Sequence, residues 1–381
     1  MNIFTLYREI LYIVHKRYKL SMKKILIILV FFILMNSALC NAFPFFIFHT
    51  SSKHSDYIIE DATPKDDAFH GINNKYCLEW WYFDVVFNEN HGIHIGLMVN
   101  SFMSWGFVRE MINIYNNTNV EEKETRFKPL NQYEISEEVP EIKYNDKKLM
   151  EFDYDEYISS GNWNYSINLE MEKIKVDLKF IGKSKPFKYE TDGEGWTVAQ
   201  PKAEVEGIIT INGEELIIDG TGYHDHNWNF SVKTGIKGKG WYWGKLASQN
   251  YSLTWSKIEK TRFADDTISE KIGILSISDK DYIKIDSKNI TFAEYDYEYH
   301  DGRFIPTKFK LHAIQDNLEI NVNFKAESIQ RIGLRIMPLQ YWRYFISITG
   351  FIKLGENIDY FENNIQIMEC MKFLNNIGWE N

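Results

Sequence analysis

The sequence predicts an all-β protein made of two antiparallel sheets or barrels of similar size that meet near residue 235. Aromatic residues make up 16% of the 381 residues, and this bias favours broad sheets with aromatic faces. Short strand-like segments separated by turn residues recur about every 8–12 residues, which is typical of a sandwich or barrel. Only residues 328–339 suggest a helical period longer than three turns.

The elements of the first half are expected in the following order. Residues 43–70 are expected to form a linker or extended arm, because residues 49–70 are polar. The β-prone run 76–87 follows, and residues 120–160 show only weak strand signals between charged residues and prolines. Residues 183–200 hold one proline and two glycines and are expected to form a long loop. Further strands are expected at 93–99, 107–115, 132–135, 151–157, 164–171 and 174–180.

The clearest hairpin spans residues 205–219. Asn212-Gly213 lies between two strand-like runs, which predicts a type I′ turn. The strands expected in the second half are 241–247, 251–258, 271–277, 282–285, 290–300, 307–313, 318–324, 345–352 and 365–373. We therefore assign residues 71–235 to an N-terminal barrel and residues 236–381 to a C-terminal barrel.

Residues 1–42 have the composition of a secretory signal. Six basic residues and one acid precede an uninterrupted apolar run over 25–35, and small and polar residues follow. The apolar segment 43–48 extends this run towards membrane-spanning length, so an uncleaved membrane anchor stays an alternative. Both interpretations predict an extracytoplasmic protein, either secreted or anchored to the cell membrane.

The charge of the chain argues against nucleic acid as a partner. The formal net charge is −10, and it becomes −15 without residues 1–42, where no long basic run is left to meet phosphates. Only Cys77 and Cys370 then remain. A disulfide between them is one alternative, but buried free thiols are the preferred interpretation because Cys77 lies in an apolar strand.

Two separated motifs identify a resemblance. They read Glu79-Trp-Trp-Tyr-Phe-Asp84 and Gly222-Tyr-His-Asp-His-Asn-Trp228, and Trp241-Tyr-Trp-Gly-Lys245 follows the second. From about residue 56 to the C-terminus the chain resembles the lipocalin-like family of carotenoid 1,2-hydratases (hydroxyneurosporene synthases) and AttH-like proteins. The resemblance implies two lipocalin-like β-barrels in tandem. It also implies an apolar small-molecule partner, such as an isoprenoid, a carotenoid or another lipid.

The second motif suggests acid catalysis. In an extended strand His224, His226 and Trp228 share one face, while Tyr223 and Asp225 share the other. Hydration of an isolated double bond needs a proton donor and an electron-rich ring that stabilises the cation, and in the hydratases the H-x-W pattern found here at residues 226–228 is proposed to participate. The predicted catalytic residues are His224, Asp225, His226 and Trp228. The predicted ligand-binding residues are Glu79, Trp80, Trp81, Tyr82, Tyr223, Trp241 and Trp243.

Other interpretations of these residues remain open. The hydratases use a tyrosine and a carboxylate slightly downstream, but residues 250–255 contain no acid, so Asp225 or Glu79 would have to serve. Alternatively, Asp225 and His226 simply hydrogen-bond across the junction between the barrels. The chain would then be a non-catalytic lipid carrier or a structural or stress protein of the envelope.

The two carboxylates of the first motif are expected on opposite faces. Glu79 shares a face with Trp81, Phe83 and Phe87, and Asp84 shares the other with Trp80 and Tyr82. Each needs a partner if it is buried. The candidate partners are Arg109, Lys245, His224 and His226. Trp241 and Trp243 share a face and are expected to line or cap the second barrel.

No cofactor and no metal are expected. The chain contains no nucleophile elbow, phosphate-binding loop or dinucleotide-binding glycine motif. A metal site stays a competing interpretation, in which His224 and His226 on one strand face are completed by His94 or His91.

Overall fold

The computed structural model describes residues 57–72, 76–88, 90–102, 105–191, 194–229, 238–261, 267–279, 281–300, 302–332 and 339–373. The signal or anchor expected over residues 1–42 lies outside these ranges, and so does the predicted domain boundary near residue 235. Within these ranges, no helix has the length and apolar character needed to span a membrane.

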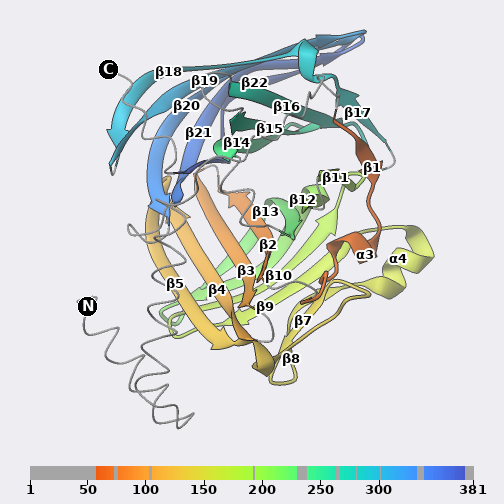
Figure 1. Cartoon of the computed structure of the whole chain (residues 1–381), viewed down its shortest axis with the longest axis vertical. Helices are drawn as coiled ribbons and strands as arrows, with labels where there is room; N and C mark the ends of the chain where they lie inside the picture. The colour runs from red at the N-terminus through yellow and green to blue at the C-terminus, as the bar shows by residue number, and fades with distance from the viewer. Residues whose placement is uncertain are drawn as a thin grey trace, which may run out of the picture.

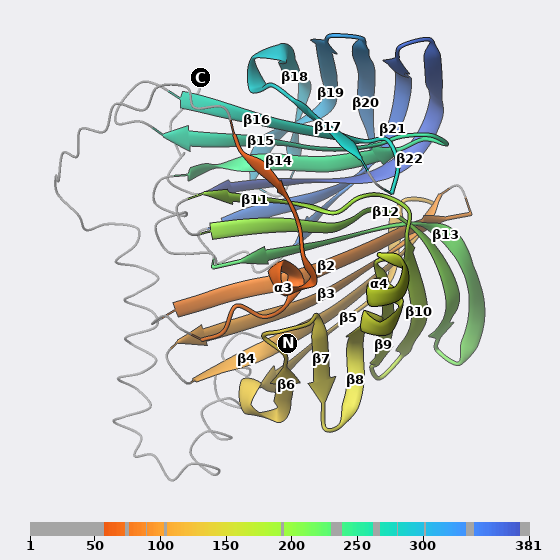
Figure 2. The ribbon, with the colours of Figure 1, turned by 90° about the vertical axis from the view of Figure 1, so that its right-hand side faces the viewer.

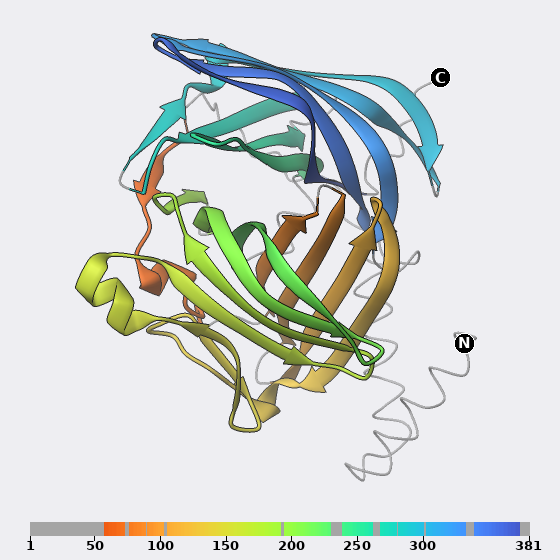
Figure 3. The ribbon, with the colours of Figure 1, turned by 180° about the vertical axis from the view of Figure 1, so that it is seen from behind.

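The all-β prediction is confirmed, because nearly all regular structure lies in two antiparallel sheets (Figure 1). The first sheet has the order β5-β4-β3-β2-β13-β12-β10-β9-β8-β7-β6 and curls into a nearly closed barrel (Figure 3). Its longest strands are β2 (Tyr76–Phe87), β3 (His91–Phe102), β4 (Trp105–Asn116), β5 (Asn119–Pro129), β12 (Glu194–Ile211) and β13 (Glu214–Trp228). The remaining strands are β6 (Tyr133–Ile135), β7 (Glu141–Tyr144), β8 (Lys147–Phe152), β9 (Asn164–Glu170) and β10 (Ile174–Gly182), with the short helix η1 (Leu130–Gln132) between β5 and β6.

The second sheet has the order β17-β16-β15-β14-β22-β21-β20-β19-β18 and arches over the first (Figure 3). Its first strands are β14 (Gly238–Ala247), β15 (Ser252–Thr261), β16 (Thr267–Ser276) and β17 (Tyr282–Ile285), and η2 (Ser287–Asn289) follows. Its last strands are β18 (Ile290–His300), β19 (Arg303–Gln315), β20 (Leu318–Ile332), β21 (Leu339–Leu354) and β22 (Asn357–Phe373).

The predicted Asn-Gly hairpin joins β12 to β13. Asn212 has φ 51° and Gly213 has φ 91°, and Ile211 pairs with Glu214 on either side of them. Two successive positive φ angles are the property of a type I′ turn, which only asparagine and glycine adopt readily. The prediction is confirmed, and the hairpin places the second motif in the middle of the sheet.

Three expectations about secondary structure are wrong. The loop expected at 183–200 contains β11 (Phe187–Thr191) and the start of β12, because Phe187 and Val198 are buried apolar positions that pair across the turn. The helix expected over 328–339 is replaced by β20, which pairs with β21 as far as Ile332. The strand expected over 151–157 ends at Phe152, and helix α4 (Tyr154–Ser160) follows, because Asp153 caps its N-terminus and Gly161, with φ 80°, ends it.

Residues 57–72 connect the two sheets. Strand β1 (Ile59–Asp61) pairs with β11 of the first sheet, and the Tyr57 hydroxyl donates to the Gly273 carbonyl in the second at 3.0 Å. Helix α3 (Pro64–Asp67) follows; Thr63 and Asp66 form its capping box. This part of the expected arm is therefore packed against both sheets, as Figure 2 shows.

Three apolar layers result from this arrangement. One core fills the inside of the first sheet and a second fills the inside of the second sheet. A third, with Tyr82, Tyr223, Trp196 and Trp243, lies between the sheets. Because successive side chains of a strand point to opposite faces, β2 and β13 supply residues to both the first and the third layer.

Candidate functional site

The pairing of β2 with β13 brings the two motifs side by side. His226 pairs with Trp81 and His224 with Phe83, while Asp225 pairs with Tyr82. The predicted alternation holds, since His224, His226 and Trp228 face the first core and Tyr223 and Asp225 face the layer between the sheets. The structure therefore divides the predicted catalytic residues between two separate clusters.

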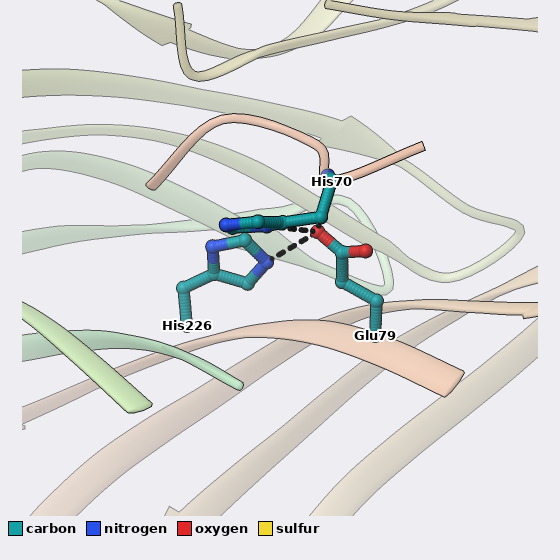
Figure 4. A group of neighbouring side chains, drawn as sticks. All are labelled: His70, Glu79 and His226. Atoms are coloured by element: carbon teal, nitrogen blue, oxygen red, sulfur yellow. Dashed lines mark hydrogen bonds and ion pairs between the residues drawn. The ribbon is translucent and has the colours of Figure 1, made fainter. Parts of the chain in front are cut away.

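The first cluster is centred on Glu79 (Figure 4). Its Oε1 lies 2.9 Å from His226 Nε2 and 3.1 Å from His70 Nδ1, and it also accepts the His70 backbone N–H at 3.0 Å. Burial alone would raise the pKa of Glu79, but hydrogen bonds with His226 and His70 outweigh it and hold that pKa below its usual value. The predicted contact between the two motifs is confirmed.

Asp67 forms the back of this cluster. Its Oδ2 accepts the Tyr165 hydroxyl at 2.8 Å and lies 3.1 Å from His224 Nε2. The other oxygen, Asp67 Oδ1, lies 3.6 Å from His226 Nδ1. Asp67 Oδ1 and His226 Nδ1 both lack a hydrogen-bond partner among the described residues. Both side chains are fully buried.

Stacked rings hold the imidazoles of this cluster. The His226 ring lies on Trp81 with centroids 4.4 Å apart, and the His70 ring lies on Trp228 at 4.0 Å. His224 stacks on Phe83 at 3.8 Å. These flat contacts fix the orientation of each ring, so the nitrogens point in set directions.

Asp225 forms the second cluster, on the opposite face of β13. Its carboxylate accepts hydrogen bonds from Trp196 Nε1 and the Tyr223 hydroxyl, both at 2.8 Å, and from Asn227 Nδ2 at 3.2 Å. Burial raises the pKa of Asp225 to about 7, although the bonds from Trp196 and Tyr223 act in the opposite direction. A carboxyl group with this pKa holds a proton for part of the time at neutral pH.

Asp84 and Lys245 form a buried ion pair beside Asp225. The Tyr82 hydroxyl also donates to Asp84 at 3.0 Å, and Lys245 Nζ lies 4.8 Å from the centroid of the Tyr223 ring. Lys245 comes from β14, so this pair joins the two sheets directly. Of the predicted partners, His226 thus meets Glu79 and Lys245 meets Asp84.

The tryptophans of β14 do not lie where they were expected. Trp243 packs in the layer between the sheets, with its ring 5.2 Å from both Tyr82 and Tyr223, and Trp241 packs against the same layer. Tyr242 instead faces the interior of the second sheet. The expectation that both tryptophans line the second barrel is wrong, because strand alternation gives that face to the residue between them. Trp80 also packs against the layer between the sheets.

The histidine set of the competing metal interpretation is not brought together, but a different group of possible ligands is. His94 pairs with Asp84 and faces the layer between the sheets, and His91 pairs with Phe87 at the far end of β2. Neither can complete a site with His224 and His226. Among the residues that the structure describes, the group that could hold an ion is instead His70, Glu79 and His226, whose ligand atoms all lie within 4.8 Å of one another.

Sequence reasoning missed His70, Asp67 and Trp196. His70 and Asp67 belong to the segment interpreted as a linker, and Trp196 to the segment interpreted as a loop. The capping-box pattern from Thr63 to Asp66 could have indicated a helix there. Nothing local in the sequence could have shown that this helix packs against β13.

Two cavities lie elsewhere. One of about 780 Å³ opens between β7, β8, β10 and β12 and is lined by charged residues such as Arg126, Lys148 and Glu170. One of about 230 Å³ lies where Lys202 approaches residues 249–252. Neither is lined by a residue of the two motifs.

Cys77 and Cys370 are both buried free thiols. The preferred interpretation of these two residues is therefore confirmed.

The comparison with known sequences gives a short match. No protein-family model matches the chain. The quinolone epoxide rearrangement protein penF of Penicillium thymicola is 40% identical over 57 residues, which are 15% of this chain and 16% of that protein. The chain thus matches only about a sixth of the length of this curated relative.

Solved structures share the fold over most of the chain. A protein provisionally classed as an AttH, from Nitrosomonas europaea, aligns over 82% of this chain and 97% of its own, with a TM-score of 0.58 and 14% identity. CghA in complex with Sch210972 aligns over 79% of this chain and 89% of its own, with a TM-score of 0.53 and 8% identity. Identities this low show the fold alone. The fold is AttH-like, and the prediction of two lipocalin-like barrels is confirmed.

Proposed function

We propose that this protein binds an apolar small molecule, such as an isoprenoid, a carotenoid or another lipid, between its two sheets and protonates it with Asp225. The observation that carries the proposal is the position of the Asp225 carboxyl group, which is buried beside the ring systems of Trp196 and Tyr223. An acid next to aromatic faces is what a reaction through a carbocation needs, because the rings stabilise the positive charge.

The proposed reaction is hydration of a carbon–carbon double bond, of the type that a carotenoid 1,2-hydratase performs. The proton of Asp225 would bond to one alkene carbon, and a water oxygen would bond to the other and release a proton back to the carboxylate. Trp243 and Tyr82 would lie against the ligand. A relative whose name describes epoxide rearrangement supports this class, since acid opening of an epoxide also develops positive charge on carbon.

Ligand entry is a requirement of this proposal. The aromatic side chains around Asp225 are buried and packed against one another, so in this proposal some of them move when a ligand binds. His224, His226 and Trp228 would then act from the other face of β13 by fixing the strand. In this proposal Glu79 and Trp81 support the site rather than touch the ligand.

A lipid carrier is the second candidate function. The observation that favours it is that Asp225 already accepts three hydrogen bonds from protein donors, as expected of a carboxylate that holds a junction together. A carrier would use the same layer without a proton transfer.

Incubation of the purified protein with lycopene separates the two. The enzyme proposal predicts a product heavier by one water, and Asp225→Asn should lower the rate by about 100-fold or more, as for loss of a general acid. Asp219→Asn is the matched control, because Asp219 is an exposed carboxylate on the same strand. No product together with co-purified lipid in the extract would support the carrier. No product and no bound lipid would contradict both.

Export is part of the proposal and has its own test. The mature protein, recovered from cells that make it naturally, should either begin near residue 43 or stay with the membrane fraction at full length. Intact protein in the cytoplasmic fraction would contradict both forms of export.

A further inference from the structure

We propose that His70, Glu79 and His226 form a binding site for a divalent transition-metal ion such as zinc. The site lies on the opposite face of β13 from Asp225 and is independent of the function proposed above. Two imidazole nitrogens and one carboxylate oxygen are a ligand set that suits zinc and its neighbours in the first transition series.

The first support is convergence of the ligand atoms. His226 Nε2 and His70 Nδ1 both point at Glu79 Oε1, at 2.9 and 3.1 Å. Around a tetrahedral zinc ion with bonds of about 2.0–2.2 Å, neighbouring ligand atoms are about 3.3 Å apart. The two contacts of Glu79 Oε1 would therefore lengthen by only a few tenths of an ångström around an ion, and all three ligand atoms already lie within 4.8 Å of one another.

The second support is the unsatisfied pair behind His226. Its Nδ1 faces Asp67 Oδ1 across 3.6 Å, and both atoms are buried without a hydrogen-bond partner among the described residues. A metal on Nε2 leaves the single proton of a neutral imidazole on Nδ1. That N–H would then donate to Asp67, and metal-binding histidines usually make this contact with a carboxylate.

The third support is rigidity of the surroundings. Trp81 and Trp228 stack on the rings of His226 and His70, and Tyr165 holds the other oxygen of Asp67. Ligands fixed in this way need little reordering when an ion binds. The His70 side chain is 20% exposed, whereas Glu79 is fully buried, so an ion would enter from the side of His70.

A metal here would join three distant parts of the chain. His70 belongs to the segment after α3, Glu79 to β2 and His226 to β13. The competing interpretation is that His226 carries two protons and bridges Glu79 and Asp67 as an imidazolium ion, with no metal. The two interpretations differ in what the protein does when an ion is offered.

Titration of the full-length protein with Zn²⁺ after treatment with a chelator tests the proposal. Calorimetry should give one ion per chain, and Co²⁺ should produce the visible absorption of a four-coordinate nitrogen–oxygen site. His70→Ala should weaken binding by more than about 100-fold, and Asp67→Asn by about 10–100-fold, as for loss of a supporting carboxylate. His91→Ala is the control and should bind like the unaltered protein, because His91 lies on β3 opposite Phe87, at the end of β2 away from Glu79.

His70 is the best ligand to replace, because it is the one that is partly exposed, and circular dichroism confirms that the variant is folded. Binding that is equally tight in folded His70→Ala would show an adventitious surface ion and overturn the proposal. Absence of stoichiometric binding to the unaltered protein at micromolar zinc would also overturn it and would favour the imidazolium bridge.

Discussion

Glu79 and His226, 147 positions apart in sequence, are in hydrogen-bonding contact at 2.9 Å and join the two motifs inside the first barrel. Both side chains are fully buried. Removing the Glu79 acceptor leaves buried N–H groups of His226 and His70 without a partner, which costs about 1–3 kcal/mol for each unsatisfied group. Glu79→Leu should therefore lower the free energy of unfolding in urea by this amount. Glu170→Gln, at an exposed ion pair, should leave it nearly unchanged because solvent screens exposed charges.

His226→Ala distinguishes a structural from a catalytic role of the same contact. We expect a loss of about 3 kcal/mol or more in unfolding free energy, because Glu79 keeps only its contacts with His70 and a weak one with Cys77. Urea unfolding measures this directly. A variant as stable as the unaltered protein but without lycopene turnover would contradict the structural interpretation.

Lys245→Met tests the ion pair between the sheets. Asp84 would stay buried without its cation, so the unfolding free energy should fall by about 3–5 kcal/mol. The double variant with Asp84→Asn should recover part of this loss, since no charge is then left unpaired. Urea unfolding of both single variants and the double variant gives the coupling energy. A loss in the double variant equal to the sum of the losses in the two single variants would show that the two residues do not interact.

Gly195→Ala tests the position of Trp228. Gly195 pairs with Trp228, and a methyl group on its Cα would overlap the indole ring. The ring must move, at a cost of about 1–3 kcal/mol for overpacking. Tryptophan fluorescence and urea unfolding should both change. Unchanged emission and stability would mean that the indole does not lie on this glycine.

Glu259 predicts an acid-sensitive contribution to stability. Burial alone would raise the pKa of Glu259. The nearby cations Lys372 and Lys257 outweigh this effect, so the pKa lies below its usual value of 4.5. A group whose pKa is lower in the folded than in the unfolded protein stabilises the fold at any pH above its unfolded-state pKa. This stabilisation is lost as the pH falls through the folded-state pKa. The difference in unfolding free energy between the unaltered protein and Glu259→Gln should shrink from pH 6 to pH 3. A constant difference would contradict the prediction.

Strand alternation explains why much of the site could be predicted. In β13 it correctly assigned His226 and Asp225 to opposite faces, and in β2 it separated Glu79 from Asp84. The Asn212-Gly213 turn fixed the register of β12 and β13 because only one backbone geometry suits that pair. These are local properties, and local properties are encoded in short windows of sequence.

The parts that could not be predicted depend on long-range packing. His70 and Asp67 enter the site only because β1 pairs with β11, more than 120 residues later in the chain. Trp243 faces the first sheet because of how the two sheets stack, which no periodicity records. The pairing of Glu79 with His226 rather than His224 likewise follows from the offset between β2 and β13.

The side chains of β2 and β13 also favour one register between these two strands. A slip of one residue between these strands would exchange every side chain between the first core and the layer between the sheets. Glu79 would then lose its contact with His226, and Asp84 would lose its contact with Lys245. Each buried carboxylate left without its partner would destabilise the shifted register by several kcal/mol. The two buried contacts, one on each face of the sheet, therefore favour the native register of these strands over a register shifted by one residue.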